Sequence, residues 1–258
     1  ARSSAEAGAT CIALIEKSGG EGPVLSLASI TLRTPAGRRA KQQTLVEGLT
    51  FQVEDGMSVL IAGQSGIGKS SLLRGIAGLW RDGQGCVRRC GGSSVFFMPQ
   101  RPYMFLGTLR DQLLYPDVEL SAVPDKSVEA ALSDVQLGYI LERYSLDDTE
   151  SWATVLSLGE QQRINFARVL LQPALQLVLI DEGTSACDPA NERHLYELLT
   201  RRLRSFISVG HRPALRCYHT HALWLRRRGP GHDVGRTECP NMWSFLQMAE
   251  YEQLVESA

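Results

Sequence analysis

The stretch Gly63-Gln-Ser-Gly-Ile-Gly-Lys-Ser-Ser71 follows the apolar run Ser58-Val-Leu-Ile-Ala62 and opens the helical run Ser71-Leu-Leu-Arg-Gly-Ile-Ala77. A strand that passes through a glycine-rich turn into a helix aims backbone N–H groups and the positive end of the helix dipole at one point, where a polyphosphate can bind. The alternative is a glycine-rich turn that binds nothing. The full G-x-x-x-x-G-K-S pattern in this setting favours a phosphate-binding loop.

Each residue type in this loop has a chemical reason to be there. Glycines allow backbone conformations and a close approach that side chains would block. Lys69 would reach the β and γ phosphates as a point charge, and Ser70 would offer its hydroxyl to Mg²⁺. The residues expected to bind the nucleotide are Gly63, Gln64, Ser65, Gly66, Ile67, Gly68, Lys69, Ser70 and Ser71.

The composition is that of a globular protein. The chain has 258 residues, 43% of them apolar, which is enough for a core in one large domain or two small ones. A formal net charge of −1 gives no overall attraction to nucleic acid, and we expect no nucleic-acid partner. No run approaches the roughly 18 apolar residues of a membrane helix, and we expect the chain to be soluble as given. It begins with Ala rather than Met, as a piece of a longer protein would.

The six cysteines are expected to be free thiols, because they are too few and too scattered for a disulfide scaffold. A metal site is the alternative, since Cys217, His219 and His221 lie close together in the sequence. These residues fall in an alternating segment, 216–225, that is typical of a strand, and no paired C-x-x-C supplies the other half of a zinc site. We therefore expect a strand there.

Strands and helices alternate along most of the chain, which is typical of an α/β protein with a mainly parallel sheet. Two strand-like runs before the phosphate loop predict an antiparallel edge, a turn-rich segment follows Trp80, and a helical region is inserted after it. The expected strands are 24–32, 49–53, 58–62, 94–100, 175–180, 206–209 and one near 221. The expected helices are 71–77, 108–114, 127–143, 158–171 and 190–204.

Two further segments carry chemistry. Asp181 and Glu182 follow the buried strand at 175–180, and ligands of such sheets bind outside the carboxyl ends of the strands. Asp181 can hold Mg²⁺ through water and Glu182 can polarise an attacking water, although two carboxylates can also merely cap a turn. Ser157-Leu-Gly-Glu-Gln161 begins a helix whose N-terminal amides offer a second anion site. By itself, that segment favours an ordinary helix cap.

Together these pieces resemble the nucleotide-binding domain of an ABC transporter over about residues 24–228. The resemblance implies a P-loop NTPase core with a mainly parallel sheet, an antiparallel β edge and an inserted α-helical subdomain. The motifs it identifies are Walker A at 63–70, the Q-loop glutamine Gln100, the signature at 156–161, Walker B at 177–181 followed by the catalytic Glu182, the D-loop at 185–188 ending in Asp188, and the switch histidine His211.

The surrounding sequence is similar to subfamily D of these transporters. The similarity rests on segments such as Gly78-Leu-Trp80, Pro99-Gln-Arg-Pro-Tyr-Met104, Gly107-Thr-Leu-Arg-Asp-Gln112 and Ser208-Val-Gly-His-Arg-Pro213. That group contains peroxisomal fatty acyl-CoA half-transporters, a lysosomal cobalamin relative and bacterial homologues. Ser157-Leu-Gly-Glu-Gln-Gln162 is most similar to the bacterial branch.

The resemblance implies a Mg²⁺-dependent ATPase that powers transport across a membrane. Two such domains would close head to tail on two ATP molecules, each ATP lying between Walker A of one chain and the signature of the other. The catalytic residues would be Lys69, Glu182 and His211, the Mg²⁺ ligands would be Ser70, Gln100 and Asp181, and the residues that contact the ATP of the other chain would be Ser157, Leu158, Gly159, Glu160 and Gln161.

The implied partners are a second nucleotide-binding domain, with a homodimer expected, and transmembrane domains that precede residue 1. The domain would lie on the cytosolic side of a bacterial inner membrane or an organelle membrane. The transported substrate contacts the membrane domains, so this sequence does not specify it.

Three departures from the family pattern stand out. Leu158 replaces the glycine of most signatures, which would leave the helix amides and Ser157 available. No Tyr or Phe stands between residues 24 and 50 to stack on adenine, so Pro35 or an aliphatic neighbour would have to serve. Gly183 replaces the usual alanine after the glutamate and is expected to loosen the turn.

Two other classes of protein fit this sequence less well. A soluble ABC ATPase acting on ribosomes or DNA usually pairs two nucleotide domains in one chain or inserts a long coiled coil, and 258 residues hold neither. A P-loop kinase or GTPase would not need 156–161, and no guanine-reading N-K-x-D is present.

The expected organisation has three parts. Residues 1–23 form a linker or flexible arm, 24–239 form the nucleotide-binding domain with a helical subdomain at about 101–172, and 240–258 form a C-terminal helical tail. The tail is expected to pack against the same domain, and a surface for a partner is the alternative.

Overall fold

A computed structural model describes residues 11–17, 22–35, 42–91, 94–116, 123–227 and 241–257. The chain divides into two compact units. We call 1–91 with 220–258 the loop unit, because it holds the phosphate loop, and 92–219 the helical unit. Most of the expected linker, at 1–10 and 18–21, lies outside the described residues.

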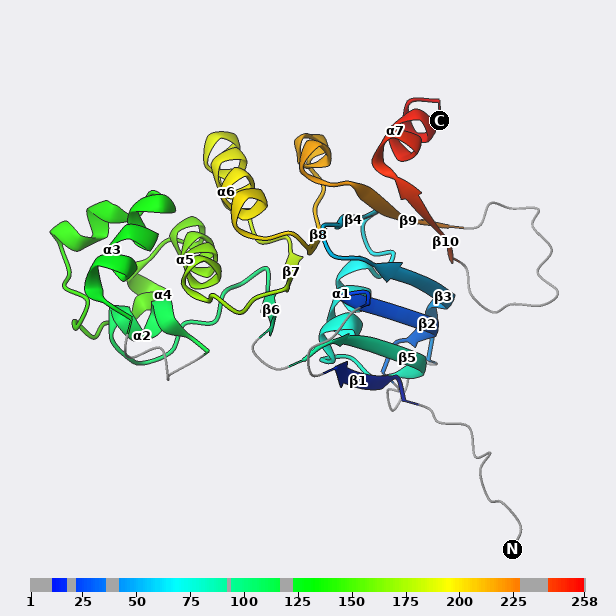
Figure 1. The fold of residues 1–258 in the computed structure, drawn as a ribbon, viewed down its shortest axis with the longest axis horizontal. Coiled ribbons are helices and arrows are strands. Elements are labelled where there is room, and N and C mark those ends of the chain that lie inside the picture. The colour runs from blue at the N-terminus through cyan, green and yellow to red at the C-terminus, as the bar shows by residue number, and fades with distance from the viewer. Residues whose placement is uncertain are drawn as a thin grey trace, which may run out of the picture. The chain divides into compact units, whose positions relative to one another are not determined.

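The loop unit contains a four-stranded sheet in the order β1-β5-β2-β3 (Figure 1). Strand β2 pairs antiparallel with both β3 and β5, while β1 pairs parallel with β5. The described elements of the unit are β1 (Ala13–Lys17), β2 (Leu25–Arg33), β3 (Thr44–Val53), β4 (Ser58–Gly63), α1 (Lys69–Ala77), β5 (Gly83–Cys90), β9 (His221–Arg227), β10 (Asn241–Gln247) and α7 (Met248–Glu256).

The predicted antiparallel edge is present, but two of its strands were not expected. Strand β1 lies in the presumed linker, and β5 lies in the segment expected to be turns. Neither strand buries many side chains, so neither has a clear apolar pattern in its sequence. Strand β1 is mostly exposed, and β5 buries only Gly83 and Val87 fully. These segments become strands because β2 offers an edge to β5, and β5 offers its other edge to β1.

The C-terminal segment was expected to be helical throughout, and this is wrong for its first half. Residues 241–247 form β10, which pairs antiparallel with β9, and β9 in turn pairs parallel with β4. The side chains of 242–247 alternate along a strand, with Trp243 and Phe245 on one face. The Trp243 indole donates to the Glu47 carbonyl at 3.0 Å, and Phe245 stacks on Phe51.

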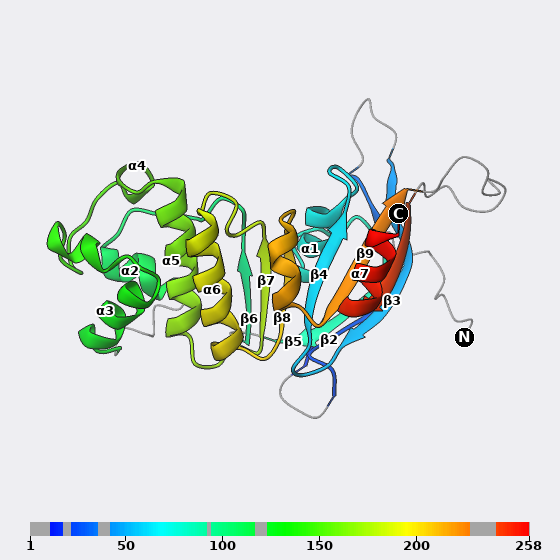
Figure 2. The same ribbon diagram turned by 90° about the horizontal axis from the view of Figure 1, so that it is seen from above.

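Helix α7 completes the loop unit. Figure 2 shows it lying along β9. Its Met248 and Tyr251 are buried in a small core with Leu60, Ala62 and Ala222. The tail therefore packs against its own unit, as the amphipathic pattern predicted.

The helical unit combines three parallel strands, in the order β8-β7-β6, with a group of helices. Helices α5 and α6 lie side by side in it (Figure 2). Its elements are β6 (Val95–Met98), α2 (Leu109–Leu114), α3 (Asp125–Asp134), the 3₁₀ helix η3 (Gly138–Glu142), α4 (Trp152–Val155), α5 (Leu158–Leu171), β7 (Leu177–Asp181), α6 (Pro189–Arg202), β8 (Phe206–Val209) and the 3₁₀ helix η4 (Pro213–Tyr218).

Two predictions in the helical unit need correction. The single helix expected at 127–143 is α3 followed by η3, because Gln136 adopts a left-handed φ of 59° between the buried Val135 and Leu137. The strand expected at 216–225 begins only at His221, and its first part belongs to η4. Both segments have apolar residues at spacings that fit more than one element, and tertiary packing selects the observed one.

One apolar core fills the helical unit. It includes Trp152, Ile164, Ile180, Leu195 and many neighbouring residues from each of its helices and strands. The longest helices described, α5 and α6, have 14 residues each, and no described helix is long and apolar enough to cross a membrane.

Candidate functional site

The phosphate loop connects β4 to α1 in the loop unit, as the sequence predicted. Lys69, the first residue of α1, folds its side chain back over the loop and is only 5% exposed. Its ammonium group donates to the carbonyl oxygens of Gly63 at 2.8 Å and Gln64 at 3.0 Å. The loop therefore places one cation at its centre.

Two glycines give the loop its shape. Gly63 has a φ of 144°, and a β-carbon there would lie 2.4 Å from the Leu225 carbonyl oxygen on β9. Gly68 has a φ of 106° and is the N-cap of α1. Because glycine has no side chain, α1 begins without a side-chain cap, and its first turn contains no acidic residue. No acidic side chain of the helix's own first turn therefore competes with an anion for the positive end of the helix.

A second group of polar side chains lies at the carboxyl ends of the strands of the helical unit. Glu182 directly follows β7 and adopts a left-handed φ of 50°, which is costly for a residue with a side chain. Gln100, after β6, donates its amide Nε2 to Glu182 Oε2 at 2.7 Å. His211, after β8, brings Nε2 to within 3.1 Å of Glu182 Oε1.

Parallel strands end at the same edge of a sheet, which is why residues 29 to 111 positions apart in the sequence meet there. Each carboxylate oxygen of Glu182 has a nitrogen partner, so its side chain is held in one orientation. A fixed carboxylate next to a half-exposed histidine can orient a water molecule and accept a proton from that water.

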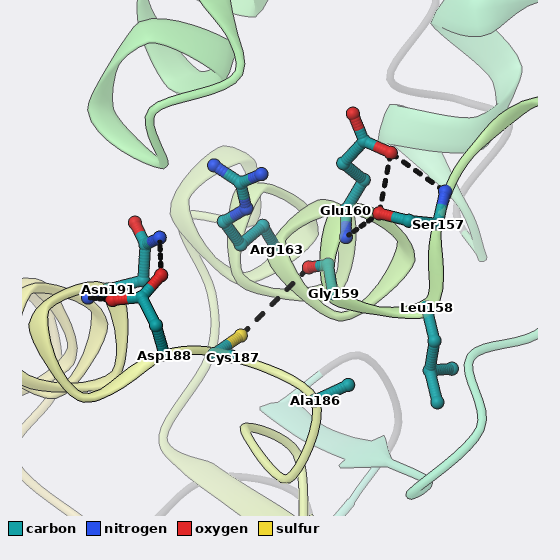
Figure 3. A pocket seen from close by; sticks show the side chains of 9 residues that line it. All are labelled: Ser157, Leu158, Gly159, Glu160, Arg163, Ala186, Cys187, Asp188 and Asn191. Carbon is teal, nitrogen blue, oxygen red and sulfur yellow. Dashed lines mark hydrogen bonds between the residues drawn. The ribbon is translucent and has the colours of Figure 1, made fainter.

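A third group surrounds the N-terminus of α5. A pocket lies between this helix end and the start of α6 (Figure 3), and its volume is about 370 Å³. The pocket is lined by Ser157, Leu158, Gly159, Glu160, Arg163, Ala186, Cys187, Asp188 and Asn191. The structure therefore brings the segments 157–163 and 186–191 together within the helical unit, although they are distant in the sequence.

Ser157 is the N-cap of α5 and forms a capping box with Glu160. Glu160 Oε2 accepts from the Ser157 amide at 2.7 Å and from the Ser157 hydroxyl at 2.6 Å (Figure 3). The prediction that Ser157 stays available is therefore wrong for this conformation, because its hydroxyl proton is directed at Glu160. Leu158 points away from the helix and is 41% exposed.

Asp188 caps the neighbouring helix α6. Its Oδ1 accepts from the amides of Ala190 and Asn191, both at 2.9 Å. The bonds from Asn191 hold the pKa of Asp188 below its ordinary value. The carboxylate therefore stays charged at the rim of the pocket.

Residues 46–185 match the protein-family model described as "ABC transporter". The chain belongs to the ABC transporter family. It is 48% identical over 210 residues to an uncharacterized ABC transporter ATP-binding protein of Synechocystis sp., a match that covers 81% of this chain and 31% of that protein. It is 38% identical over 252 residues to ABC transporter D family member 2, chloroplastic, of Arabidopsis thaliana, covering 80% and 35%.

A human relative, ATP-binding cassette sub-family D member 3, is 36% identical over 211 residues, covering 80% of this chain and 31% of the relative. The chain thus spans about a third of the length of these relatives. A solved structure, of a bacterial Atm1-family ABC exporter with ATP bound, superposes with a TM-score of 0.68 at 22% identity, over 83% of this chain and 39% of that one. The fold is that of the ABC ATPase domain, an α/β P-loop NTPase.

Within this ABC domain, the structure gives two of the departures a physical setting. A β-carbon at Gly183 would lie 2.8 Å from Ile180 Cγ2, so the turn after Glu182 has room for a side chain there only if Ile180 shifts. On β3, Leu45 lies 3.3 Å from where a β-carbon of Gly68 would be. An aliphatic side chain thus flanks the phosphate loop in the stretch that lacks an aromatic residue.

Sequence reasoning missed Gln162 as an organising residue of this ABC domain. Its side chain is fully buried and donates Nε2 to the Gln100 carbonyl at 2.9 Å and to the Ser185 hydroxyl at 3.1 Å. Its Oε1 accepts from the Ala186 amide at 2.9 Å. Gln162 therefore joins α5 to the segment after β6 and to the segment at 185–186.

Arg212, the residue after His211, was also missed. It donates Nη1 to the Cys187 carbonyl at 3.1 Å and lies 3.2 Å from the buried carboxylate of Glu192. The sequence shows only that Gln162 and Arg212 are polar residues next to a motif. Whether their side chains are buried and which groups they contact depends on the tertiary structure.

The donor set expected for Mg²⁺ is chemically suitable, because hydroxyl, amide and carboxylate oxygens are the ligands this hard cation prefers. Gln100 uses its amide nitrogen on Glu182, so its carbonyl oxygen is the atom that can face a cation. Asp181 ends β7 with a side chain that is only 1% exposed. Ser70 lies in the first turn of α1.

The alternative zinc site receives no support from the geometry of His219. Its Nε2 lies 2.7 Å from the Ser208 hydroxyl and its Nδ1 lies 2.7 Å from the Leu215 carbonyl, so both ring nitrogens are engaged. Among the described residues, no group of three or more His, Cys, Asp or Glu side chains could hold a metal ion.

Proposed function

We propose that this chain is the ATP-hydrolysing domain of a half-transporter, and that it dimerises head to tail on ATP to power transport across a membrane. The observation that carries the proposal is the position of Glu182, which is held from both sides by Gln100 at 2.7 Å and His211 at 3.1 Å. A carboxylate prepared in this way suits the activation of water, and it lies in a chain whose phosphate loop suits a triphosphate.

In the proposed reaction, Lys69 and the backbone of residues 63–71 hold the β and γ phosphates. Ser70, Gln100 and Asp181 would hold Mg²⁺, which would neutralise charge on the phosphates. Glu182 accepts a proton from the attacking water, and His211 keeps Glu182 and the γ-phosphate in line. Ser157 and Gly159 of a second copy bind the same nucleotide from the other side, so one chain alone has an incomplete site.

The relatives support the assembly part of the proposal. Their names include ABC transporters of the D family, and the match covers only about a third of each relative. We propose that the chain works with transmembrane domains and a second, identical nucleotide-binding domain, on the cytosolic side of a membrane. The transported substrate would contact the membrane domains, and its class is outside the proposal.

The test is whether ATP assembles a dimer when hydrolysis is blocked. Glu182→Gln keeps the shape of the side chain and removes the proton acceptor. With saturating Mg-ATP at high protein concentration, light scattering should show a rise toward twice the monomer mass, which removal of ATP reverses. The control is Lys69→Ala combined with Glu182→Gln, which should stay monomeric because it lacks the phosphate contact. Monomeric Glu182→Gln that still binds ATP would contradict the head-to-tail mechanism.

A further inference from the structure

Glu160 of the signature is held by a residue outside every recognised motif. The hydroxyl of Tyr139, in η3, donates to Glu160 Oε1 at 2.5 Å. The other oxygen, Oε2, accepts from the Ser157 amide and hydroxyl. Both oxygens of the Glu160 carboxylate are therefore engaged, one by the N-cap of the helix and one by Tyr139.

An arginine supports the same arrangement. Arg163 lies one turn after Glu160 on α5 and donates Nη1 to the Gln136 carbonyl at 2.8 Å. Its Nη2 lies 3.4 Å from the Tyr139 hydroxyl. Gln136 is the left-handed residue between α3 and η3, so the contact holds the turn that leads into η3 and Tyr139.

The chemistry of Glu160 conflicts with the ligand proposed for this surface. Glu160 and Ser157 both line the pocket at the start of α5, where a triphosphate would approach. A carboxylate at this position repels a triphosphate unless its negative charge is directed elsewhere. A hydrogen bond to the other carboxylate oxygen draws negative charge away from the pocket and fixes the direction of the side chain.

The geometry points to Tyr139 as a positioning residue for the second half of the nucleotide site: by holding Glu160, it makes the N-terminus of α5 able to accept the triphosphate bound to another copy of this chain. The inference rests on the proposed function, because it requires association on ATP. Burial and the bond to Glu160 both raise the pKa of the Tyr139 hydroxyl, so it stays a donor at neutral pH.

The experiment is a double-mutant cycle in the Glu182→Gln background, with dimer dissociation measured by light scattering at saturating Mg-ATP. Tyr139→Phe removes the hydroxyl alone and should weaken the dimer by about tenfold, the size expected for one bond to a charged group. Tyr144→Phe is the matched control: it removes a hydroxyl in the same unit that contacts Arg143 and not Glu160, and should have no effect.

The second arm of the cycle uses Glu160→Gln, which keeps a capping box and removes the charge. If Tyr139 acts through that charge, Tyr139→Phe should cost nothing further once Gln replaces Glu160. An equal loss in both backgrounds would mean that Tyr139 acts only through packing, and an unchanged dimer in Tyr139→Phe would mean that it does not act at all. Either outcome overturns the inference.

If the Glu182→Gln parent does not dimerise, the proposed function fails. The role of Tyr139 can still be tested on the monomer. Hydrogen exchange of the Ser157 amide reports its bond to Glu160. Tyr139→Phe should accelerate this exchange severalfold, while Tyr144→Phe should not. Unchanged exchange in Tyr139→Phe would show that Tyr139 does not hold Glu160.

Discussion

The N-terminus of α1 and the N-terminus of α5 are both candidate phosphate sites, and they are built in opposite ways. Helix α1 begins at a glycine, has no side-chain cap and has no acidic residue in its first turn. Helix α5 begins at Ser157 and is closed by a capping box with Glu160. The amides at the start of α1 have no side-chain cap and are available to an anion. At the start of α5, the side chains of Ser157 and Glu160 cap the helix.

The difference indicates what each unit contributes. The loop unit supplies backbone amides and one lysine, so its site exists as soon as β4 and α1 form. The helical unit supplies side chains from separate strands and helices: Gln100, Glu182, His211 and Ser157. We expect changes in the loop unit to alter binding and folding, and changes in the helical unit to alter the rate and the association of two copies.

The largest effect should follow from Glu182→Gln, which tests whether side chains of the helical unit set the rate of hydrolysis. Removing a general base costs roughly 10² to 10⁴ in rate, so steady-state ATP hydrolysis should fall by that factor while ATP binding persists. Phosphate release and equilibrium binding measure the two quantities. Glu129→Gln, at an exposed position on α3, is the matched control and should keep the parent rate. A parent-like rate in Glu182→Gln would remove Glu182 from catalysis.

The helical unit should also respond to pH through His219. Burial lowers the pKa of His219 from 6.5 to about 4, because its bond to the Leu215 carbonyl only partly opposes the desolvation. The unfolded chain then binds a proton that the folded chain does not, so stability is full above pH 6.5 and is lost as the pH falls toward 4. The loss should reach about 3 kcal/mol, with about 2 kcal/mol of it between pH 7 and 5.

Urea unfolding at a series of pH values measures this loss, and the comparison is with His219→Gln, which cannot titrate. His194→Gln, on α6, controls for the loss of a less buried histidine. The difference in unfolding free energy between parent and His219→Gln should change across pH 7 to 5. A parallel pH dependence of the parent and His219→Gln would contradict a buried neutral His219.

In the loop unit, Lys69→Ala should remove most nucleotide binding. Ligand at a hundred times its dissociation constant stabilises a protein by about 2.7 kcal/mol, and this gain in the parent should nearly vanish in the variant. Thermal unfolding with and without Mg-ATP measures it, with the exposed Lys126→Ala as the control. Equal stabilisation of Lys69→Ala and the parent would refute the phosphate-loop assignment.

The shape of the loop can be tested apart from its charge. Gly63→Ala introduces a β-carbon 2.4 Å from a backbone oxygen at a φ of 144°, whereas Gly66→Ala has a φ of 75° and no atom within 4 Å of the new carbon. We expect a loss in unfolding free energy of about 3 kcal/mol for Gly63→Ala and about 1 kcal/mol for Gly66→Ala. Equal losses, measured by chemical denaturation, would mean that the close approach of Leu225 is not the cause.

The smallest effect should be the preference for the base. Leu45 offers an aliphatic side chain next to Gly68, and apolar contacts to a base distinguish adenine from guanine weakly. Competition binding should show ATP preferred over GTP by about tenfold or less, near 1.4 kcal/mol. A preference above about a hundredfold would show that another residue recognises adenine.

Many local elements could be predicted from the sequence because their signals are local. The phosphate loop, the helix at 158–171 and the apolar strand before Asp181 each carry their own pattern, and each forms where expected. Strands β1 and β5 could not be predicted, because each depends on an edge that another strand provides. The strand at 241–247 was missed because its aromatic residues also suit an amphipathic helix.

The sequence by itself determined the family of this protein and the identity of its chemical groups, since motif spacing and residue type are properties of the chain. Only the tertiary structure decided which groups are already paired. Glu182 meets Gln100 and His211 because three parallel strands end at one edge. Ser157 is paired with Glu160, whose other carboxylate oxygen accepts from Tyr139 in η3. Such pairing depends on distances between segments far apart in the chain, which periodicity and spacing do not encode.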